Sequence, residues 1–290
     1  MSPPVDGQDS YRATALQLIE RAGILARTQV ITNLNVERDR DQSTFEKILA
    51  EIAQDKPLAT RVIQLANSAW FGGRVKVDSV PVAFGRLGTK DFCKAAMAAA
   101  LRFRLDENAE FSKWWQHSET IAHLCEMIAQ HLNPELIEPA FQAGLLRDCA
   151  VPLMMKNVAD YSYLADEALG FAPISVEMET ECNQTDHCTV GAVLAAAWKF
   201  PATQQIVVQN HHAQTLSGAR TPEARQVLAI TLLAERVDGW SKMPDTVFFA
   251  GPEEDALRSE IARAFGITIQ AVDDTLAEML RLYRLRQSHA

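Results

Sequence analysis

Apolar side chains recur every three or four positions along most of the chain, which is the spacing of one face of an α-helix. Residues 10–26 show the pattern first, and their apolar face is Ala15, Leu18, Ile19, Ala22 and Leu25. Residues 1–9 contain two prolines and few apolar positions, so we expect a disordered lead. Strand-like alternation is rare, and we expect only a short extended piece near residues 30–34. The pattern predicts an all-α protein.

Caps, prolines and glycines mark the predicted helix ends. Asp55 ahead of Pro57 predicts a helix start, and Gly88 predicts a helix end. The polar segment 106–110 is the natural seam between an N-terminal helical bundle and a C-terminal one, although a core continuous across the seam fits the same pattern. The predicted parts are a lead and first helix at 1–27, a helical subdomain at 28–105, a second at 106–240 and a helical extension at 241–290.

Composition narrows the class of protein. The chain has 290 residues, 48% of them hydrophobic, which is enough for a sizeable core. The formal net charge of −9 argues against a protein that coats nucleic acid, because that function needs a concentrated cationic surface. We find no apolar run of the ~18–20 residues that a membrane span requires and no secretion leader. Five cysteines, an odd and scattered set, favour a reducing cytoplasm.

Histidines are the first candidates for chemistry. His117, His187 and the pair His211-His212 lie at three separate places that a helical core can bring together. Asp148 lies in an apolar stretch, where a carboxylate is costly to bury without a cation or strong donors. These residues could form a divalent-metal site. Spacing alone equally allows each histidine to cap a helix or to bond a backbone carbonyl.

The order of short motifs carries a resemblance to a known family. The chain reads LANSAWFG at 65–72, WQHS at 115–118, AGLLRD at 143–148 and TDH at 185–187. NHH at 210–212 and LLAE at 232–235 follow. Over about residues 25–240 the chain resembles the HDOD family, bacterial signalling domains related to HD-type phosphohydrolases and HD-GYP cyclic-dinucleotide phosphodiesterases. The resemblance implies a multi-helix fold in which an N-terminal helical bundle packs on an HD-like C-terminal bundle.

Two departures from the HD pattern weaken an enzymatic interpretation. HD-type hydrolases carry adjacent His and Asp where this chain has Arg147 and Asp148, and a guanidinium has no lone pair for a metal. Relatives commonly carry Asp where this chain has Glu235, whose longer side chain puts the carboxylate elsewhere. The candidate metal ligands that remain are His117, Asp148, His187 and His211 or His212.

Arg147 has three interpretations. Its guanidinium could replace a metal by pairing with Asp148 or Glu235 in the interior. It could point to the surface and leave a weak metal site intact. It could also form, with the histidines, a site for a small anionic ligand such as a phosphate ester. We favour the first, which predicts a degenerate pocket made of His117, Arg147, Asp148, His187, His211, His212 and Glu235.

The departures from the HD pattern predict a non-catalytic protein, and the resemblance implies a bacterial regulator that acts in signal transduction through contacts with signalling proteins. The cysteine content favours a cytoplasmic location. We expect no cofactor, no membrane attachment and no direct nucleic-acid partner. The alternative is a metal-dependent phosphohydrolase or cyclic-dinucleotide phosphodiesterase that uses a divalent ion to activate water.

Smaller features receive structural interpretations. Cys182 and Cys188 flank His187, but their C-x5-C spacing is not a common zinc spacing, so we assign them no ligand role. Cys149 is expected to be a core residue and not a nucleophile. Trp70 and Phe71 are expected to anchor a turn in the core.

Overall fold

The structure is a computed structural model that describes residues 5–27, 29–37, 42–68, 70–71, 76–105, 112–159, 161, 175–241 and 251–287. Within these residues every regular element is a helix, so the predicted all-α class is confirmed. The first half contains α1 (Val5–Ala22), α2 (Ile24–Arg27), α3 (Gln29–Glu37), α4 (Gln42–Gln54), α5 (Lys56–Ala66), α6 (Val80–Leu105) and α7 (Ser112–Leu132). The second half contains η2 (Pro134–Leu136), α8 (Ile137–Leu146), α9 (Val151–Asn157), α11 (Val176–Asn183), α12 (His187–Ala197), α13 (Ala202–Asn210), α14 (Pro222–Ser241), α15 (Pro252–Phe265) and α16 (Ile269–Gln287).

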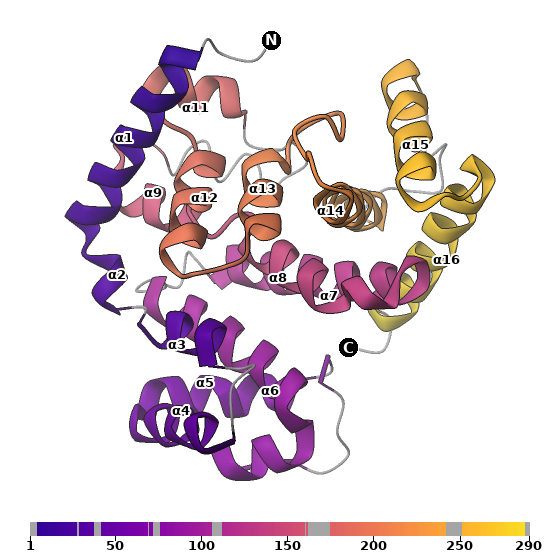
Figure 1. Cartoon of the computed structure of the whole chain (residues 1–290). Helices are drawn as coiled ribbons and strands as arrows, with labels where there is room; N and C mark the ends of the chain where they lie inside the picture. The colour runs from indigo at the N-terminus through magenta and orange to yellow at the C-terminus, as the bar shows by residue number, and fades with distance from the viewer. Residues whose placement is uncertain are drawn as a thin grey trace.

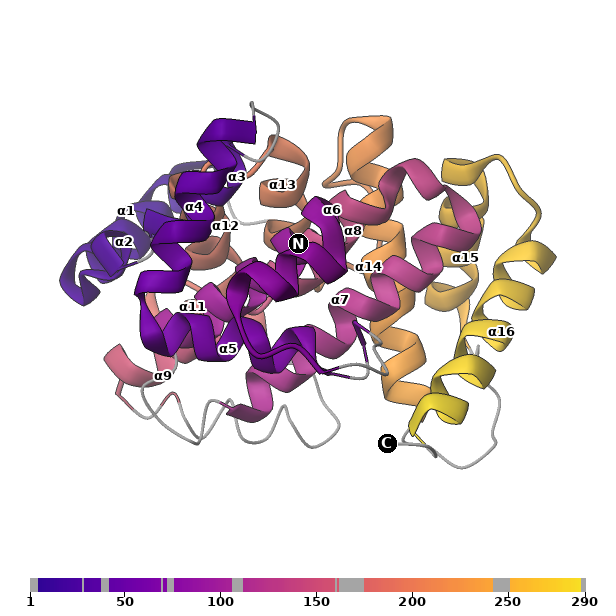
Figure 2. The ribbon, with the colours of Figure 1, turned by 90° about the horizontal axis from the view of Figure 1, so that it is seen from below.

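The helices follow one another across the molecule in an order that positions the site. Helices α3 to α6 form one end of the molecule, and α7 and α8 run across its centre (Figure 1). Helix α1 packs against α12, while α15 and α16 lie on the side opposite α1 and α2 in both views (Figures 1 and 2). Helices α8, α12, α13 and α14 occupy the middle and pack in succession, α12 on α13, and α13 and α14 on α8.

Local sequence explains the predicted boundaries. Asp55 is the N-cap of α5, and its carboxylate accepts a hydrogen bond from the backbone N–H of Leu58 at 3.2 Å. Gly88 interrupts α6 with φ 69° and ψ 177°, a conformation that L-residues rarely adopt, so two helical stretches meet there as predicted. Asn67 holds the turn after α5, because its side-chain amide exchanges hydrogen bonds with the backbone of Val77 at 2.8 and 2.9 Å.

Two predictions about the N-terminal part are wrong. Helix α1 begins at Val5, so part of the expected disordered lead is helical. The expected extended piece at 30–34 is the helix α3. Its apolar residues Val30, Ile31 and Leu34 are 4% or less exposed, and their spacing places them on one helical face. Burial of that face outweighs the β-propensity of the two branched residues.

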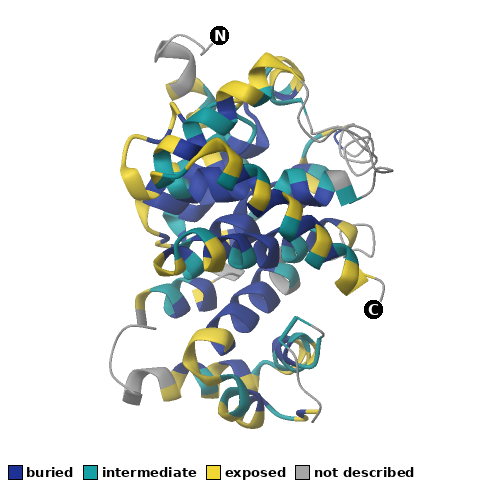
Figure 3. Cartoon of the chain, turned by 90° about the vertical axis from the view of Figure 1, so that its right-hand side faces the viewer, coloured by how far each residue is buried: buried dark blue, intermediate teal, exposed yellow. Residues whose placement is uncertain are grey.

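Among the described residues, buried apolar side chains form two hydrophobic cores. The first core contains residues of every helix from α1 through α6, together with residues of α7, α8, α9 and α12. The second core contains residues of α7 and α8 and of every helix from α13 through α16. Buried positions concentrate in the central helices (Figure 3). The first core holds Leu101, from before the predicted seam, and Trp114 and Phe141, from after it. It is therefore continuous across 106–110, a segment outside the described residues, and the division into domains stays a prediction.

In the described part of the chain, no helix combines the length and the apolar character needed to cross a membrane.

Candidate functional site

The ends of three helices bring most of the predicted site residues together. Arg147 and Asp148 directly follow α8, His187 is the first residue of α12, and His211 and His212 directly follow α13. Because these helices pack on one another near the centre of the molecule, residues separated by more than sixty positions come into hydrogen-bond distance. Four of these five residues are buried, and His212 is partly exposed.

His187 is held in one orientation by a buried carboxylate. Asp186 is the N-cap of α12 and accepts from the N–H of Thr189 at 2.8 Å, which fixes the helix start. The Nδ1 atom of His187 lies 2.6 Å from Oε2 of Glu179 on α11. Glu179 is fully buried and also accepts a hydrogen bond from the hydroxyl of Tyr161. The carboxylate therefore fixes the ring and keeps the proton on Nδ1, so that Nε2 faces the site.

Three imidazoles converge on one point. The Nε2 atom of His187 lies 3.3 Å from Nε2 of His211 and 2.9 Å from Nε2 of His212. Nδ1 of His211 donates to the carbonyl of Val208 at 2.8 Å, which leaves its Nε2 free to face the other rings. Burial and the charged neighbours His211 and His187 lower the pKa of His212, so this ring is neutral. Nitrogen lone pairs that face one another at these distances require a proton or a metal ion between them.

Asp148 connects the imidazoles to Arg147. Its Oδ1 lies 3.2 Å from Nε2 of His211 and 3.6 Å from Nε2 of His187, while its Oδ2 forms a short ion pair with Nη1 of Arg147. The two residues of the ion pair are 5% and 3% exposed. Burial alone would raise the pKa of Asp148, but Arg147 and then His211 hold it well below its usual value. Despite burial, Cys188 and Asp148 raise the pKa of His211 to about 10.

Arg147 points into the interior. Its Nε lies 3.6 Å from Oε1 of Glu235 on α14, in addition to the contact with Asp148. Although burial opposes the charge, Asp148, Glu235 and Asp238 raise the pKa of Arg147. The surface-pointing alternative for Arg147 does not describe this structure. The guanidinium therefore lies near three carboxylates, those of Asp148, Glu235 and Asp238, which stabilise its positive charge.

His117 stands apart from the imidazole cluster. It lies on α7, where its Nδ1 is 3.4 Å from Oδ2 of Asp238, and a quarter of its side chain is exposed. Of the four predicted metal ligands, the structure groups Asp148, His187 and His211, and places His117 against Asp238.

Two residues of the cluster were not predicted. Cys188 lies with its Sγ 3.6 Å from Nε2 of His187 and 3.7 Å from Nδ1 of His211, and within the described residues one ligand atom from each of four side chains lies within 4.8 Å of every other. Those four residues are His187, Cys188, His211 and His212. Glu179 is the other addition. The signal for Cys188 was its place beside His187 in the first turn of a helix, whereas Cys182 is exposed and outside the cluster.

The other residues singled out in the sequence, Cys149 and Trp70, lie in packing environments outside the imidazole cluster. Burial raises the pKa of the Cys149 thiol, which is completely buried, as expected for a core residue. The Trp70 ring stacks on His123 of α7 with 4.2 Å between ring centres and 4° between planes. The guanidinium of Arg286 of α16 lies 5.0 Å from the centre of the Trp70 ring. Trp70 therefore joins the turn after α5 to α7 and to the C-terminal helix.

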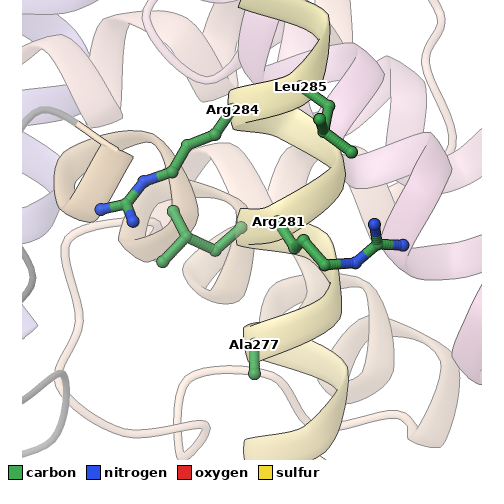
Figure 4. A pocket seen from close by; sticks show the side chains of 5 residues that line it. Ala277, Arg281, Arg284 and Leu285 are labelled. Atoms are coloured by element: carbon green, nitrogen blue, oxygen red, sulfur yellow. The ribbon is translucent and has the colours of Figure 1, made fainter.

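A pocket elsewhere on the surface has no connection to these histidines. It is formed by α16 and lined by Ala277, Leu280, Arg281, Arg284 and Leu285 (Figure 4). The side chains of Arg281 and Arg284 extend to opposite sides of the helix, so the two charges do not converge on one ligand.

The all-helical fold, with a histidine–aspartate cluster at the ends of its central helices, defines an HD-like helical domain. The chain belongs to the HDOD family, because the model of the HDOD domain matches residues 25–214. No curated protein matches the chain.

Solved structures share the fold. An HDOD domain protein of unknown function from Geobacter sulfurreducens is 20% identical with a TM-score of 0.61, covering 94% of this chain and 97% of that one. A provisionally assigned phosphohydrolase from Shewanella amazonensis SB2B is 23% identical with a TM-score of 0.62, covering 87% and 89%. A provisionally assigned signal transduction protein from Marinobacter aquaeolei VT8 is 17% identical with a TM-score of 0.64, covering 97% of this chain and 65% of that one.

Proposed function

We propose that this protein is a regulator in bacterial signal transduction that acts through contacts with other signalling proteins and does not hydrolyse phosphate esters. The observation that carries the proposal is the interior position of Arg147, paired with Asp148 and close to Glu235. Membership of the HDOD family and the fold shared with a provisionally assigned signal transduction protein support it.

The argument against hydrolysis is electrostatic. A metal-dependent phosphohydrolase needs divalent ions whose charge activates water and stabilises the transition state. A fixed guanidinium next to Asp148 disfavours a divalent ion on the Arg147 side of that carboxylate, and it cannot act as a ligand because it has no lone pair. Arg147 therefore supplies the positive charge that Asp148 and Glu235 need in the interior, without supplying a site for water.

The same charges disfavour the anion-site alternative. Burial raises the pKa of Glu235, and Arg147 opposes that shift. Asp148, Glu235 and Asp238 all act on Arg147 and raise its pKa. A phosphate ester bound at Arg147 would meet these carboxylates as well as the arginine, so we do not assign a small anionic ligand to this pocket.

The competing function is a metal-dependent phosphohydrolase. The observation that favours it is the convergence of His187, His211 and His212, three nitrogen ligands suited to a transition-metal ion. The fold shared with a provisionally assigned phosphohydrolase agrees with this alternative.

Hydrolysis assays separate the two functions. The full chain would be incubated with Mn²⁺ or Fe²⁺ and with a generic phosphodiester or a cyclic dinucleotide, and product release would be measured. We expect no turnover above that of a His187→Ala control. Turnover that chelation abolishes and His187→Ala removes would contradict the proposal.

An Arg147→His variant tests the same idea in reverse. It restores a nitrogen ligand beside Asp148 and removes the competing charge, so we expect tighter binding of Mn²⁺ or Fe²⁺ than in the unaltered chain, measured as metal retained per chain. Equal retention by both chains would show that Arg147 does not occupy a metal position.

A further inference from the structure

The hydrogen bonds around the imidazole cluster are of the kind found around metal-binding histidines. His187 and His211 each have Nδ1 engaged, the first by the Glu179 carboxylate and the second by the Val208 carbonyl. Outer hydrogen bonds of this kind fix the tautomer of a metal-bound histidine and turn Nε2 toward the ion. His212 is the partly exposed member, so it offers a route by which an ion can enter from solvent.

The distances between the ligand atoms match a small tetrahedral site. Bonds of about 2.0–2.1 Å to nitrogen and about 2.3 Å to sulfur place two nitrogens roughly 3.3 Å apart, and a nitrogen and a sulfur roughly 3.6 Å apart. The structure has 3.3 and 2.9 Å between the Nε2 atoms of His187 and its two histidine neighbours, and 3.6 Å from the same atom to Sγ of Cys188. All four ligand atoms lie within 4.8 Å of one another, a spread that small side-chain rotations can close.

Arg147 lies outside this group of ligands. Asp148 stands between, with one oxygen toward Arg147 and the other toward His211 and His187. The guanidinium thus fills one part of the pocket and leaves the histidine part available.

We propose that His187, His211, His212 and the thiolate of Cys188 bind one Zn²⁺-type ion in a closed, four-ligand site. Binding forms three metal–nitrogen bonds and one metal–sulfur bond, and it releases to solvent the thiol proton of Cys188 together with any proton held on Nε2 of His187 and His211, because a histidine must be neutral to bind a metal. Thiolate together with imidazole selects Zn²⁺ and related ions over Mg²⁺ or Mn²⁺, which prefer oxygen ligands. The inference goes beyond the proposed function and does not depend on it.

Such a site would have a structural or sensory role. Catalytic zinc sites have three protein ligands and keep a fourth position for water, whereas structural sites are closed by four protein ligands. The ion would fasten the start of α12 to the end of α13, and its presence or absence would therefore change how these two helices are held.

Cobalt provides a direct test. The metal-stripped full chain would be titrated with Co²⁺, and the near-ultraviolet absorption of a sulfur–cobalt bond would be recorded. We expect saturation at one ion per chain with a sulfur band, and displacement of Co²⁺ by Zn²⁺. Saturation without a sulfur band, or no binding at all, would overturn the proposal, and the second result would leave the imidazoles joined by a proton.

Variants and a measurement on the unaltered chain complete the test. Cys188→Ser should remove the sulfur band and weaken Zn²⁺ binding by more than the ~10–100-fold typical of an outer residue, whereas Cys182→Ser, at an exposed cysteine outside the cluster, should change neither. If Cys188→Ser fails to fold, X-ray absorption of the Zn²⁺-loaded unaltered chain must show one sulfur neighbour, and a shell of nitrogen and oxygen alone would refute the site. Phosphodiester hydrolysis is measured separately, so failure of this inference and failure of the proposed function give different results.

Discussion

Removal of the Arg147 charge should reveal how strongly the interior depends on it. In Arg147→Met the apolar part of the side chain is largely kept, but Asp148 loses its ion-pair partner at 5% exposure. Breaking a buried pair in this way typically costs about 3–5 kcal/mol. His211, whose Nε2 lies 3.2 Å from Asp148, still offers a positive charge, so we expect the lower end, about 3 kcal/mol.

Calorimetry and a double variant measure the effect. A loss of about 3 kcal/mol corresponds to a Tm lower by about 5 °C for a chain of 290 residues. In Arg147→Met/Asp148→Asn both members of the ion pair are removed together, so part of the loss should be recovered, although Glu235 loses its contact with Arg147 and His211 loses its contact with the Asp148 carboxylate. Arg281→Met, which removes an exposed arginine of α16, is the control and should leave Tm unchanged. An Arg147→Met protein as stable as the unaltered chain would refute the interior ion pair.

The pH dependence of this pair has a definite sign. Because Asp148 has a lowered pKa in the folded protein, its contribution is fully present above the pKa of an unfolded aspartate, about 3.9. The contribution is lost as pH falls through the folded value. The difference in unfolding free energy between Arg147→Met and the unaltered chain should therefore be constant from about pH 5 to pH 8 and shrink only below about pH 4. A difference that disappears near pH 6 would assign it to another group.

Three further substitutions test the surroundings of the site. Gly144→Ala should destabilise the chain by about 1–3 kcal/mol in urea unfolding, because the new Cβ would lie 2.9 Å from the Cα of Ala122 on α7. Asp186→Ala removes the N-cap of α12 and should cost about 1 kcal/mol, with Asp186→Asn as the conservative control. Glu179→Gln should weaken Zn²⁺ binding about 10–100-fold while Glu177→Gln, an exposed change on the same helix, has no effect; equal affinities would refute the positioning role of Glu179.

The helical architecture could be predicted because its signals are local. Asp55, Gly88 and the spacing of apolar residues act over one or two turns, and the structure agrees with them. The prediction of an extended piece at 30–34 failed because β-propensity is weaker than the burial of one face of α3 against the rest of the first core. That burial depends on residues far away in the chain.

The candidate site could be predicted only in part. Motif order identified Arg147, His187 and the two adjacent histidines, and the structure places them around Asp148. The order of motifs could not show that His117 faces Asp238, because that contact depends on how α7 and α14 pack. Cys188 was assigned no ligand role because C-x5-C is not a common zinc spacing. In the structure its neighbours are histidines and not the other cysteine. Distances in space, and not spacing along the chain, decide which atoms can share an ion.

The position of Arg286 has a practical consequence for work with fragments. It lies beyond residue 214, where the family match ends, yet its guanidinium lies 5.0 Å from the centre of the Trp70 ring, on which His123 also stacks. A fragment trimmed to the matched region would lack this guanidinium, and the Trp70 ring would be more open to water. Any protein captured by such a fragment should therefore be tested again with the complete chain, since an uncovered tryptophan can bind apolar surfaces that the intact molecule never meets.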